Sequence, residues 1–361
     1  MIHILHVVGA RPNFIKAAPV LRALAAKKGV RQTLVHTGQH YDLNMSDVFF
    51  RQLGMPAPDV SLGVGSGSHA AQTAQVLLGL EPVLLEKKPD AVVVYGDVNS
   101  TMAAALAAAK LRIPVVHVEA GLRSGDREMP EELNRIITDS ISDLLFTPSK
   151  DGDANLKKEG VPAGKIVFAG NAMIDTLIRM LPAAKRPTDL SRLDRYVLVT
   201  LHRPANTDDP ATLKRLMGAL AKISASTTVV FPVHPRTRKR LADAGLTAPA
   251  GVALIEPLGY LEFLALQRDA ALVITDSGGI QEETTFLGVP CLTVRTTTER
   301  PITVTAGTNR LVKDYAALPR EAAAALKRPR KAARPPKYWD GKAGERIAKA
   351  LVERFSQRRA A

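Results

Sequence analysis

At 361 residues the chain exceeds one ordinary hydrophobic core, and at roughly 150 residues per domain it predicts two domains. Hydrophobic residues make up 46% and charged residues 23%, which excludes intrinsic disorder. No apolar run approaches the ~20 residues of a membrane span, and the single cysteine, Cys291, excludes an internal disulfide framework and favours a cytoplasmic protein. The N-terminal stretch MIHILHVVGARPNF has no basic region before its apolar part, so we expect a first strand rather than a signal peptide.

Short apolar, β-rich runs alternate along the chain with longer helical patterns, which is typical of parallel βαβ units. The strands predicted in the first half are Ile2–Val8, Thr33–His36, Ala91–Tyr95, Val115–Val118, Leu144–Thr147 and Ile166–Phe168. Those predicted in the second half are Tyr196–Thr200, Val229–Val233, Val252–Ile255, Ala271–Thr275, Cys291–Val294 and Arg310–Val312. Helical periodicity fills the gaps, as in residues 17–27 and 212–223. The predicted fold class is therefore α/β, with two doubly wound, Rossmann-like domains.

The polar, basic, proline-containing segment MLPAAKRPTDLSRLDR (180–195) is typical of an interdomain linker. We predict a first Rossmann-like domain over residues 1–180, a linker over 181–195 and a second Rossmann-like domain over 196–337. Residues 338–361 are expected to contain an amphipathic helix that can pack back on the first domain.

The net charge of +14 is concentrated near the C-terminal end of the sequence. Residues 320–361 hold 13 Lys or Arg and 4 Asp or Glu, and include the segment KRPRKAARPPK (327–337). Nucleic-acid-binding surfaces usually combine basic residues with stacking aromatics, and here only Tyr338 and Trp339 are near. We therefore predict a solvated basic linker and helix, with no nucleic-acid partner and no stable membrane insertion.

Polar, ionisable and glycine residues collect directly after the strands, where open parallel sheets bind their ligands. In the first half these segments are GARPNFIK (9–16), GDVNST (96–101) and EAGLRSGDREMPEELNR (119–135). In the second half they are LHRPAN (201–206), HPRTR (234–238) and DSGGIQEE (276–283). The pattern predicts a ligand held between the two domains.

The segment DSGGIQEE indicates a phosphate site. Two glycines at a strand-to-helix turn allow backbone N–H groups to approach a phosphate, and the helix dipole favours the anion. Ser277 can donate a further hydrogen bond, Glu282 or Glu283 can accept from ribose hydroxyls, and Arg300 in TERP (298–301) adds a cation. A tight turn with a capped helix is the alternative for the glycine pair alone. Because no GxGxxG follows the first strand and no GxxxxGK[ST] occurs, neither a nicotinamide cofactor nor P-loop chemistry is expected.

Three carboxylates of the first half suit proton transfer. Asp97 and Glu119 each follow an apolar strand, where a carboxylate is unfavourable unless it is paired or used. With Glu131 they form a candidate acid–base set, although helix capping is the alternative for Asp97 and first-turn helix chemistry for Glu131. Arg11 and Lys16 offer charge for a pyrophosphate or a leaving group, with ordinary helix-surface charge as the alternative.

The histidines are scattered rather than spaced as metal ligands, so no metal site is predicted. His202 directly follows a strand and is either a core histidine or a functional group. His117 lies within a strand and is expected to be structural, while the sequence leaves the role of His234 open.

Taken together, the strings GARPxFIK, GDxNST, HxEAGLRS, PEExNR, TLHR, TDSGGxQEE and TERP resemble the non-hydrolysing UDP-N-acetylglucosamine 2-epimerases, in this order and over essentially the whole chain. The resemblance implies the glycosyltransferase-B arrangement of two Rossmann-like domains, an active site in the cleft between them, no cofactor and a homodimer. It also implies an isomerase acting on a UDP-sugar: a base removes the C2 proton while UDP leaves C1, and UDP adds back to the 2-acetamidoglucal after reprotonation on the opposite face.

The resemblance also implies roles for individual residues. For UDP these are Ser277, Gly278 and Gly279 at the diphosphate, Glu283 at the ribose, Leu258 and Phe263 near the uracil, and Arg11 and Arg300 as further charge. For the sugar these are Lys16, Asp97, Glu119 and Glu131 of the first domain, with His202 reaching across from the second. The division of the carboxylates into acid and base stays open.

Three segments depart from the best-known bacterial members of this family, namely GQHYDLN (38–44), HRPANTDD (202–209) and HPRTR (234–238). The departures resemble relatives that act on other UDP-2-acetamido sugars, including a 2,3-diacetamido uronic acid and an N-acetylfucosamine precursor. Further alternatives are a glycosyltransferase of the same architecture, a regulator that binds a nucleotide sugar without turnover, and an epimerase of the hydrolysing branch.

Overall fold

The computed structural model of the chain describes residues 1–39, 50–328, 330 and 334–360. Parts of two segments discussed above, residues 40–44 and residues 329 and 331–333, lie outside this description. The chain separates into two compact units: the first unit is Met1–Arg179 with Lys337–Ala361, and the second unit is Met180–Pro336. No helix within the described ranges is long and apolar enough to cross a membrane.

The first unit contains a seven-stranded parallel sheet in the order β3-β2-β1-β4-β5-β6-β7. Its strands are β1 (Ile2–Val8), β2 (Val30–His36), β3 (Val60–Ser61), β4 (Ala91–Tyr95), β5 (Val115–Val118), β6 (Leu144–Thr147) and β7 (Ile166–Phe168). Its helices include α1 (Arg11–Ala25), α3 (His69–Lys87), α4 (Asn99–Lys110), α5 (Pro130–Ile141), α6 (Lys150–Lys158), α7 (Ala172–Met180) and α15 (Ala343–Ala360). The sequence predicted every strand except β3, which has only two residues at the sheet edge and therefore no apolar run.

The second unit contains a six-stranded parallel sheet in the order β10-β9-β8-β11-β12-β13. Its strands are β8 (Tyr196–Thr200), β9 (Thr228–Pro232), β10 (Val252–Ile255), β11 (Leu272–Thr275), β12 (Cys291–Thr293) and β13 (Asn309–Leu311). Its helices include α8 (Pro204–Thr207), α9 (Pro210–Ser224), α10 (Pro235–Asp243), α11 (Tyr260–Asp269), α12 (Gly278–Leu287), α13 (Ile302–Thr305) and α14 (Leu318–Lys327). All six strands were predicted, and the α/β class with two doubly wound domains is confirmed.

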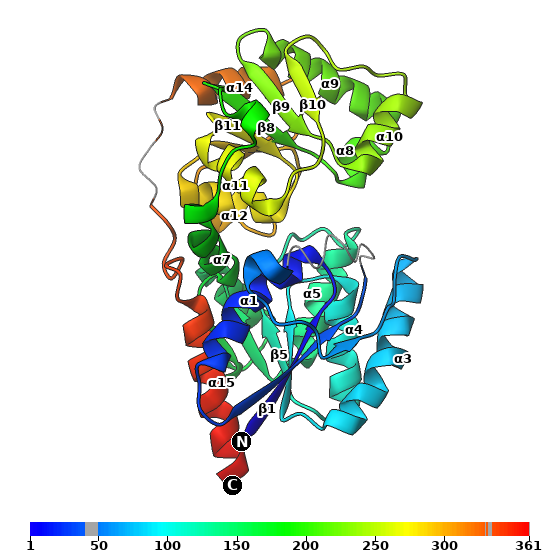
Figure 1. Cartoon of the computed structure of the whole chain (residues 1–361), viewed down its shortest axis with the longest axis vertical. Coiled ribbons are helices and arrows are strands. Elements are labelled where there is room, and N and C mark those ends of the chain that lie inside the picture. Colours follow the sequence, from blue (N-terminus) through cyan, green and yellow to red (C-terminus); the bar gives the residue numbers. More distant parts are fainter. Residues whose placement is uncertain (40–49, 329, 331–333, 361) are drawn as a thin grey trace. The chain divides into compact units, whose positions relative to one another are not determined.

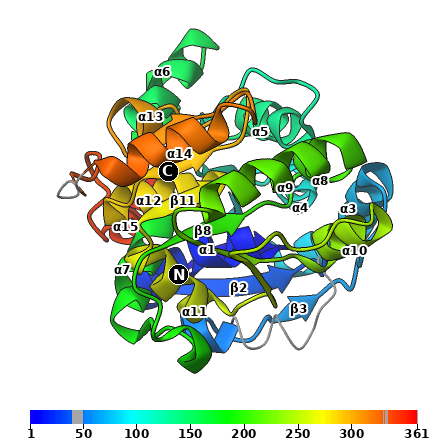
Figure 2. The ribbon, with the colours of Figure 1, turned by 90° about the horizontal axis from the view of Figure 1, so that it is seen from above.

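Two hydrophobic clusters cover opposite faces of the second sheet. Val197 and Val199 of β8 join one cluster with side chains of α9 and α14, which run side by side in Figure 2. Tyr196 and Leu198 of the same strand join the other cluster, which includes Leu266 of α11. Successive side chains of a strand point to opposite faces, so a strand covered on both faces is apolar throughout and is easily recognised in the sequence.

Helix α15 belongs to the first unit, where it lies along α1 (Figure 1). The two helices approach so closely that a Cβ atom on Gly344 would lie 2.6 Å from the carbonyl oxygen of Pro19. The carboxylate of Asp175 on α7 accepts hydrogen bonds from the backbone N–H groups of Ala343 and Gly344, at 3.2 and 2.7 Å. The C-terminal segment is thus fastened at the start of its helix to the unit that carries α1.

Candidate active site

Lys16 of α1 and Glu119, the residue after β5, form a buried ion pair in the first unit. Each side chain is only 5% exposed, so ordinary helix-surface charge is wrong for Lys16. Gly96, directly after β4, leaves room for the pair. A Cβ atom at Gly96 would lie 2.7 Å from Lys16 Nζ and 3.1 Å from Glu119 Oε2. The carboxyl ends of β4 and β5 therefore converge on one buried cation and one buried anion.

Glu119 has an unusual backbone conformation, because its φ of 77° lies in the left-handed region that non-glycine residues rarely adopt. The backbone N–H groups of Glu119 and Ala120 both donate to the carbonyl oxygen of Phe146, at 3.0 and 2.9 Å, and hold this turn. Strained backbone that is fixed by its surroundings is common at functional sites. The conformation thus supports a functional role for Glu119 independently of its charge.

Asp97, the residue after Gly96, is held by Arg135 of α5. The Arg135 side chain is 1% exposed, and its guanidinium pairs with Asp97 and also with Glu132. The amide of Asn134 donates to the backbone carbonyl of Asp97 at 2.9 Å. The cap position of α4 is Val98, so Asp97 precedes the cap residue of that helix.

Glu131 and Glu132 occupy the first turn of α5, and the structure places them differently. Glu131 is half-buried, whereas the buried carboxylate of Glu132 accepts from the backbone N–H groups of Ser124 and Gly125, at 3.0 and 2.8 Å. Burial alone would raise the pKa of Glu132, but these hydrogen bonds and the Arg135 charge hold it below its ordinary value. Glu131 was predicted from the sequence, whereas Glu132 and Arg135 were not.

The loop between β1 and α1 is tied to the end of β4 through Asn13. Its side-chain oxygen accepts from the backbone N–H groups of Gly9 and Ala10, at 3.0 and 3.2 Å, and its amide donates to the carbonyl of Tyr95 at 2.7 Å. Arg11, the first residue of α1, is exposed beside this anchor. The structure thus fixes the main chain next to Arg11 while leaving its guanidinium accessible.

In the second unit, α12 begins at Gly278, directly after Ser277 at the end of β11. The first backbone N–H groups of a helix have no intrahelical acceptor, so this turn can receive an anion. Arg300 packs against it: a Cβ atom at Gly278 would overlap the Arg300 guanidinium and lie 2.6 Å from Glu299 Oε1. Arg300 is also paired with Glu282, at 2.9 Å, and with Glu299. Its charge is therefore shared with two carboxylates.

Glu283 lies on the same helix and is buried. Burial raises its pKa to about 7, and the hydroxyl of Tyr260 donates to its Oε1 atom at 2.9 Å. Leu258 and Phe263 are half-buried and pack against the hydrophobic cluster on this face of the sheet. Of the residues implied for UDP, Glu283 is thus held through Tyr260, a contact that the sequence did not reveal.

His202 follows β8 and contacts Asp276, the residue after β11, with 3.1 Å between Nδ1 and Oδ1. The His202 side chain is 48% exposed, so His202 is not a core histidine. Asp276 is buried and also accepts from the backbone N–H of Arg203 and the amide of Asn206, both at 2.9 Å. Burial would raise the pKa of Asp276, but the contact with His202 and these hydrogen bonds lower it. Asp276 therefore orients the His202 ring as an ionised partner.

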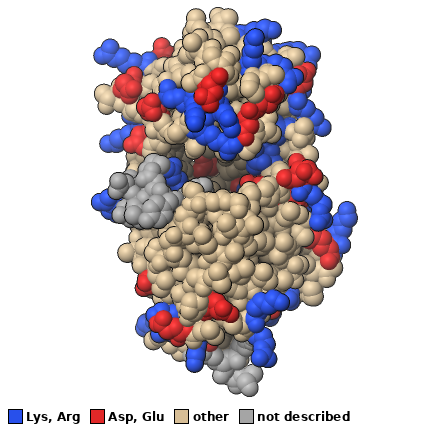
Figure 3. All heavy atoms as spheres, turned by 90° about the vertical axis from the view of Figure 1, so that its right-hand side faces the viewer, with Lys and Arg blue, Asp and Glu red and all other residues tan. Residues whose placement is uncertain are grey.

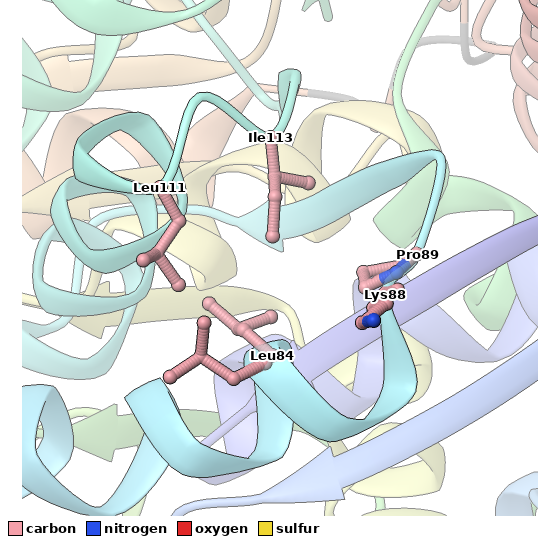
Figure 4. Close-up of a pocket in the computed structure, with 6 residues that line it drawn as sticks. Leu84, Lys88, Pro89, Leu111 and Ile113 are labelled. Atoms are coloured by element: carbon pink, nitrogen blue, oxygen red, sulfur yellow. The ribbon is translucent and has the colours of Figure 1, made fainter.

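A separate pocket lies at the opposite edge of the first sheet, near the amino ends of β4 and β5 (Figure 4). Its lining consists of Leu84, Leu85, Lys88, Pro89, Leu111 and Ile113. This mostly apolar lining does not suit a charged nucleotide sugar. In the part of the chain that the structure describes, no three His, Cys, Asp or Glu side chains are grouped so that they could hold a metal ion.

Comparisons with known proteins agree with this arrangement. A family model described as UDP-N-acetylglucosamine 2-epimerase matches residues 22–352. The chain is 47% identical over 312 residues to the UDP-2,3-diacetamido-2,3-dideoxy-D-glucuronate 2-epimerase of Pseudomonas aeruginosa. The aligned region covers 86% of this chain and 88% of that one. It is 42% identical over 359 residues to the UDP-N-acetylglucosamine 2-epimerase of Methanocaldococcus jannaschii, and this alignment covers 96% of this chain and 98% of that one.

A crystal structure of a Methanocaldococcus jannaschii UDP-GlcNAc 2-epimerase in complex with UDP-GlcNAc and UDP matches this fold with a TM-score of 0.91. The match has 42% sequence identity and covers 98% of this chain and 100% of the other. The family match and these relatives, together with the two parallel sheets and the charged residues after their strands, lead to one conclusion. The chain belongs to the UDP-N-acetylglucosamine 2-epimerase family, whose members are isomerases.

Proposed function

We propose that this protein interconverts UDP-N-acetylglucosamine and UDP-N-acetylmannosamine by inverting C2 of the sugar. The observation that carries the proposal is the buried Lys16–Glu119 ion pair next to Gly96 and Asp97. These groups follow strands β1, β4 and β5; the strand order of the first sheet reverses between β1 and β4, and β5 is the next strand beside β4. Carboxylates at such an edge can exchange protons with a substrate carbon, as C2 inversion requires.

The proposed reaction balances without an oxidant or a reductant. A carboxylate takes the C2 proton, the C1–O bond breaks, and the electron pair leaves on the phosphate oxygen of UDP, which gives 2-acetamidoglucal. In the return step this oxygen attacks C1, and C2 receives a proton on the opposite face. Inversion needs proton donors and acceptors on both faces of C2, and we propose that Asp97, Glu119 and Glu131 share this task. The Lys16 ammonium supplies positive charge beside them.

We further propose that the second unit holds UDP. The start of α12, with Ser277, Gly278 and Gly279, suits the diphosphate because its backbone N–H groups and helix dipole favour an anion. Further proposed contacts are Glu283 at the ribose, Leu258 and Phe263 beside the uracil, and Arg11, His202 and Arg300 near the phosphates or the sugar.

Calorimetric titration with UDP tests the diphosphate assignment. Gly278→Ala should weaken UDP binding by about tenfold or more, equivalent to about 1.4 kcal/mol, because the added methyl group displaces Arg300 from the turn. Gly218→Ala on α9 is the matched control, since its methyl group meets open space and should leave affinity unchanged. Equal affinities for the two variants would move the diphosphate elsewhere.

The sugar itself is tested by direct turnover. Purified protein is incubated with UDP-N-acetylglucosamine, and the appearance of UDP-N-acetylmannosamine is followed by proton NMR of the anomeric signals. Glu119→Gln should retain UDP binding and lose turnover. UDP-2,3-diacetamido-2,3-dideoxy-D-glucuronate is assayed in parallel, because a relative at 47% identity is named for that sugar. Turnover of this sugar alone would replace the substrate and keep the C2 chemistry, whereas turnover of neither would contradict the proposal.

We propose that two copies of the chain form a homodimer through the face made by α3, α4 and α5. Few charged side chains lie on this face in Figure 3, and a stripe of exposed residues on α3 consists of Ala71, Ala74, Leu78, Pro82 and Leu85. Helix α4 packs against both α3 and α5, and α5 exposes Leu133 and Ile137. An apolar area that spans neighbouring helices is typical of a protein interface.

Sedimentation equilibrium, which measures the mass of the protein in solution, tests whether this face forms the dimer. Leu78→Arg should shift the protein from dimer to monomer, because Leu78 is 74% exposed at the middle of the stripe. Val304→Arg places the same charge at another exposed apolar residue, in the second unit, and should leave the dimer intact. A dimer in both variants, or a wild-type monomer, would contradict the proposal.

We also propose a cytoplasmic location, which the single cysteine supports.

A further inference from the structure

His117 of β5 is buried, and each of its ring nitrogens faces a hydrogen-bond acceptor. Its Nε2 atom lies 2.8 Å from the backbone carbonyl oxygen of Gly96, and its Nδ1 atom lies 2.6 Å from Asp139 Oδ1. A carbonyl oxygen can only accept, so Nε2 must carry a proton to form this bond. The contact with Gly96 therefore fixes the protonation of one ring nitrogen by geometry.

Asp139 is in turn held by two donors. Its Oδ2 atom accepts from the backbone N–H of Gly121 at 3.0 Å and contacts Arg123 Nη1 at 2.7 Å. Arg123 also pairs with Glu159 at 2.7 Å. Asp139 and His117 have no exposed side-chain surface. These contacts fix the orientation of the ring, and they involve the chain on both sides of Glu119, at His117 and at Gly121.

The bond to Gly96 matters because Gly96 stands between the groups of the candidate site. Its Cα faces the Lys16–Glu119 pair, as the 2.7 Å distance from an added Cβ atom to Lys16 Nζ shows. Its carbonyl belongs to the peptide group that leads into Asp97, whose own carbonyl is held by Asn134. A shift of the Gly96 carbonyl would therefore move the Asp97 main chain and alter the space available to Lys16.

We infer that His117 is a positioning residue for the proposed C2 chemistry, acting through its Nε2–H bond to the Gly96 carbonyl while Asp139 orients the ring. This revises the purely structural role expected from its place within a strand. The inference rests on the proposed function for its kinetic test, but the hydrogen bond can be tested without turnover.

Two substitutions separate the two ends of the ring. In His117→Gln the side-chain amide reaches about as far as Nε2 and can still donate to Gly96. In His117→Asn the shorter amide reaches about as far as Nδ1 and can contact only Asp139. The Asn variant should lose about 100-fold in kcat with KM little changed, which is the typical effect of a misplacement of about 1 Å. The Gln variant should retain most of kcat. Melting temperatures report the folding of both.

A purely structural role predicts that the two variants differ only in stability, so equal kcat values per folded enzyme would overturn the inference. Nitrogen-15 NMR of labelled histidine in the wild type provides the second test. We expect a protonated Nε2 at neutral pH, and a ring with a bare Nε2 would overturn the bond to Gly96. If the wild type turned over neither sugar, the proposed function would fail, and the NMR result would still decide the hydrogen bond.

Discussion

Lys16→Met removes the cation from a buried ion pair and leaves the Glu119 carboxylate in a site that is only 5% exposed. Removing one partner of a buried pair typically destabilises a protein by about 3–5 kcal/mol, because the remaining charge has lost its compensation. The first unit has roughly 200 residues, a size at which each kcal/mol shifts the melting temperature by about 2–4 °C. Lys16→Met should therefore lower the melting temperature of this unit by about 6–20 °C.

The double variant Lys16→Met/Glu119→Gln distinguishes an isolated charge from lost packing. It also removes the carboxylate that has lost the Lys16 cation in Lys16→Met, so it should recover much of the lost stability. It should not recover turnover, because both groups belong to the proposed chemistry. The double variant is therefore expected to regain stability without regaining activity.

Tryptophan fluorescence is a specific probe for this experiment. Trp339 is the sole tryptophan of the chain and is buried in the first unit, where its indole N–H donates to the carbonyl of Pro148 at 3.0 Å. Urea unfolding followed by fluorescence thus reports the first unit separately from the second. Wild-type stability of Lys16→Met, or a double variant no more stable than Lys16→Met, would show that the buried charge of Glu119 does not set the loss of stability.

A substitution at Gly96 tests the surroundings of the site, and one at Asp175 tests the attachment of α15. Gly96→Ala should lower kcat by about 100-fold by displacing the Lys16 ammonium. Gly160→Ala, at a left-handed glycine with open space around it, should show only the backbone strain of about 1–2 kcal/mol and full turnover, and equal activity of the two would contradict the steric argument. Burial raises the pKa of Asp175 from 3.8 to about 6, so the folded chain holds the proton of this carboxyl group more tightly than the unfolded chain does. The folded state therefore loses about 3 kcal/mol of stability as the pH rises from about 4 to above 6. In urea unfolding, Asp175→Asn should gain about that much relative to wild type between about pH 4 and pH 7, and a difference independent of pH would contradict the assignment.

The strands could be predicted from the sequence because the central ones are covered on both faces. All five residues of β4 are buried and the strand appears as an uninterrupted apolar run, while β1 is buried throughout and its apolar run is broken only by His3 and His6. Strand β3 has two residues, one half-buried and one exposed, and carries no such signal. The ends of the predicted strands also identified Asp97 and Glu119 as candidate site residues, since position after a strand is a property of the local sequence.

The partners of these residues could not be predicted, because they depend on pairings between distant segments. Lys16 lies in an ordinary helical pattern, and nothing in that pattern indicates a glutamate 103 residues later. Helix α5 misleads in a different way: it buries the polar side chains of Glu132 and Arg135 and exposes Leu133 and Ile137. The usual rule that the apolar side of a helix faces the core therefore selects the wrong face here.

Inversion by the proposed route requires that C2 of the sugar loses and regains a proton. The most direct measurement is proton NMR of UDP-N-acetylglucosamine incubated with the enzyme in D2O, with Glu119→Gln as the control. We expect deuterium to appear at C2 of substrate and product while the UDP-N-acetylmannosamine signal grows, and we expect Glu119→Gln to show neither. Product that forms with its C2 hydrogen fully retained would contradict proton exchange with these carboxylates.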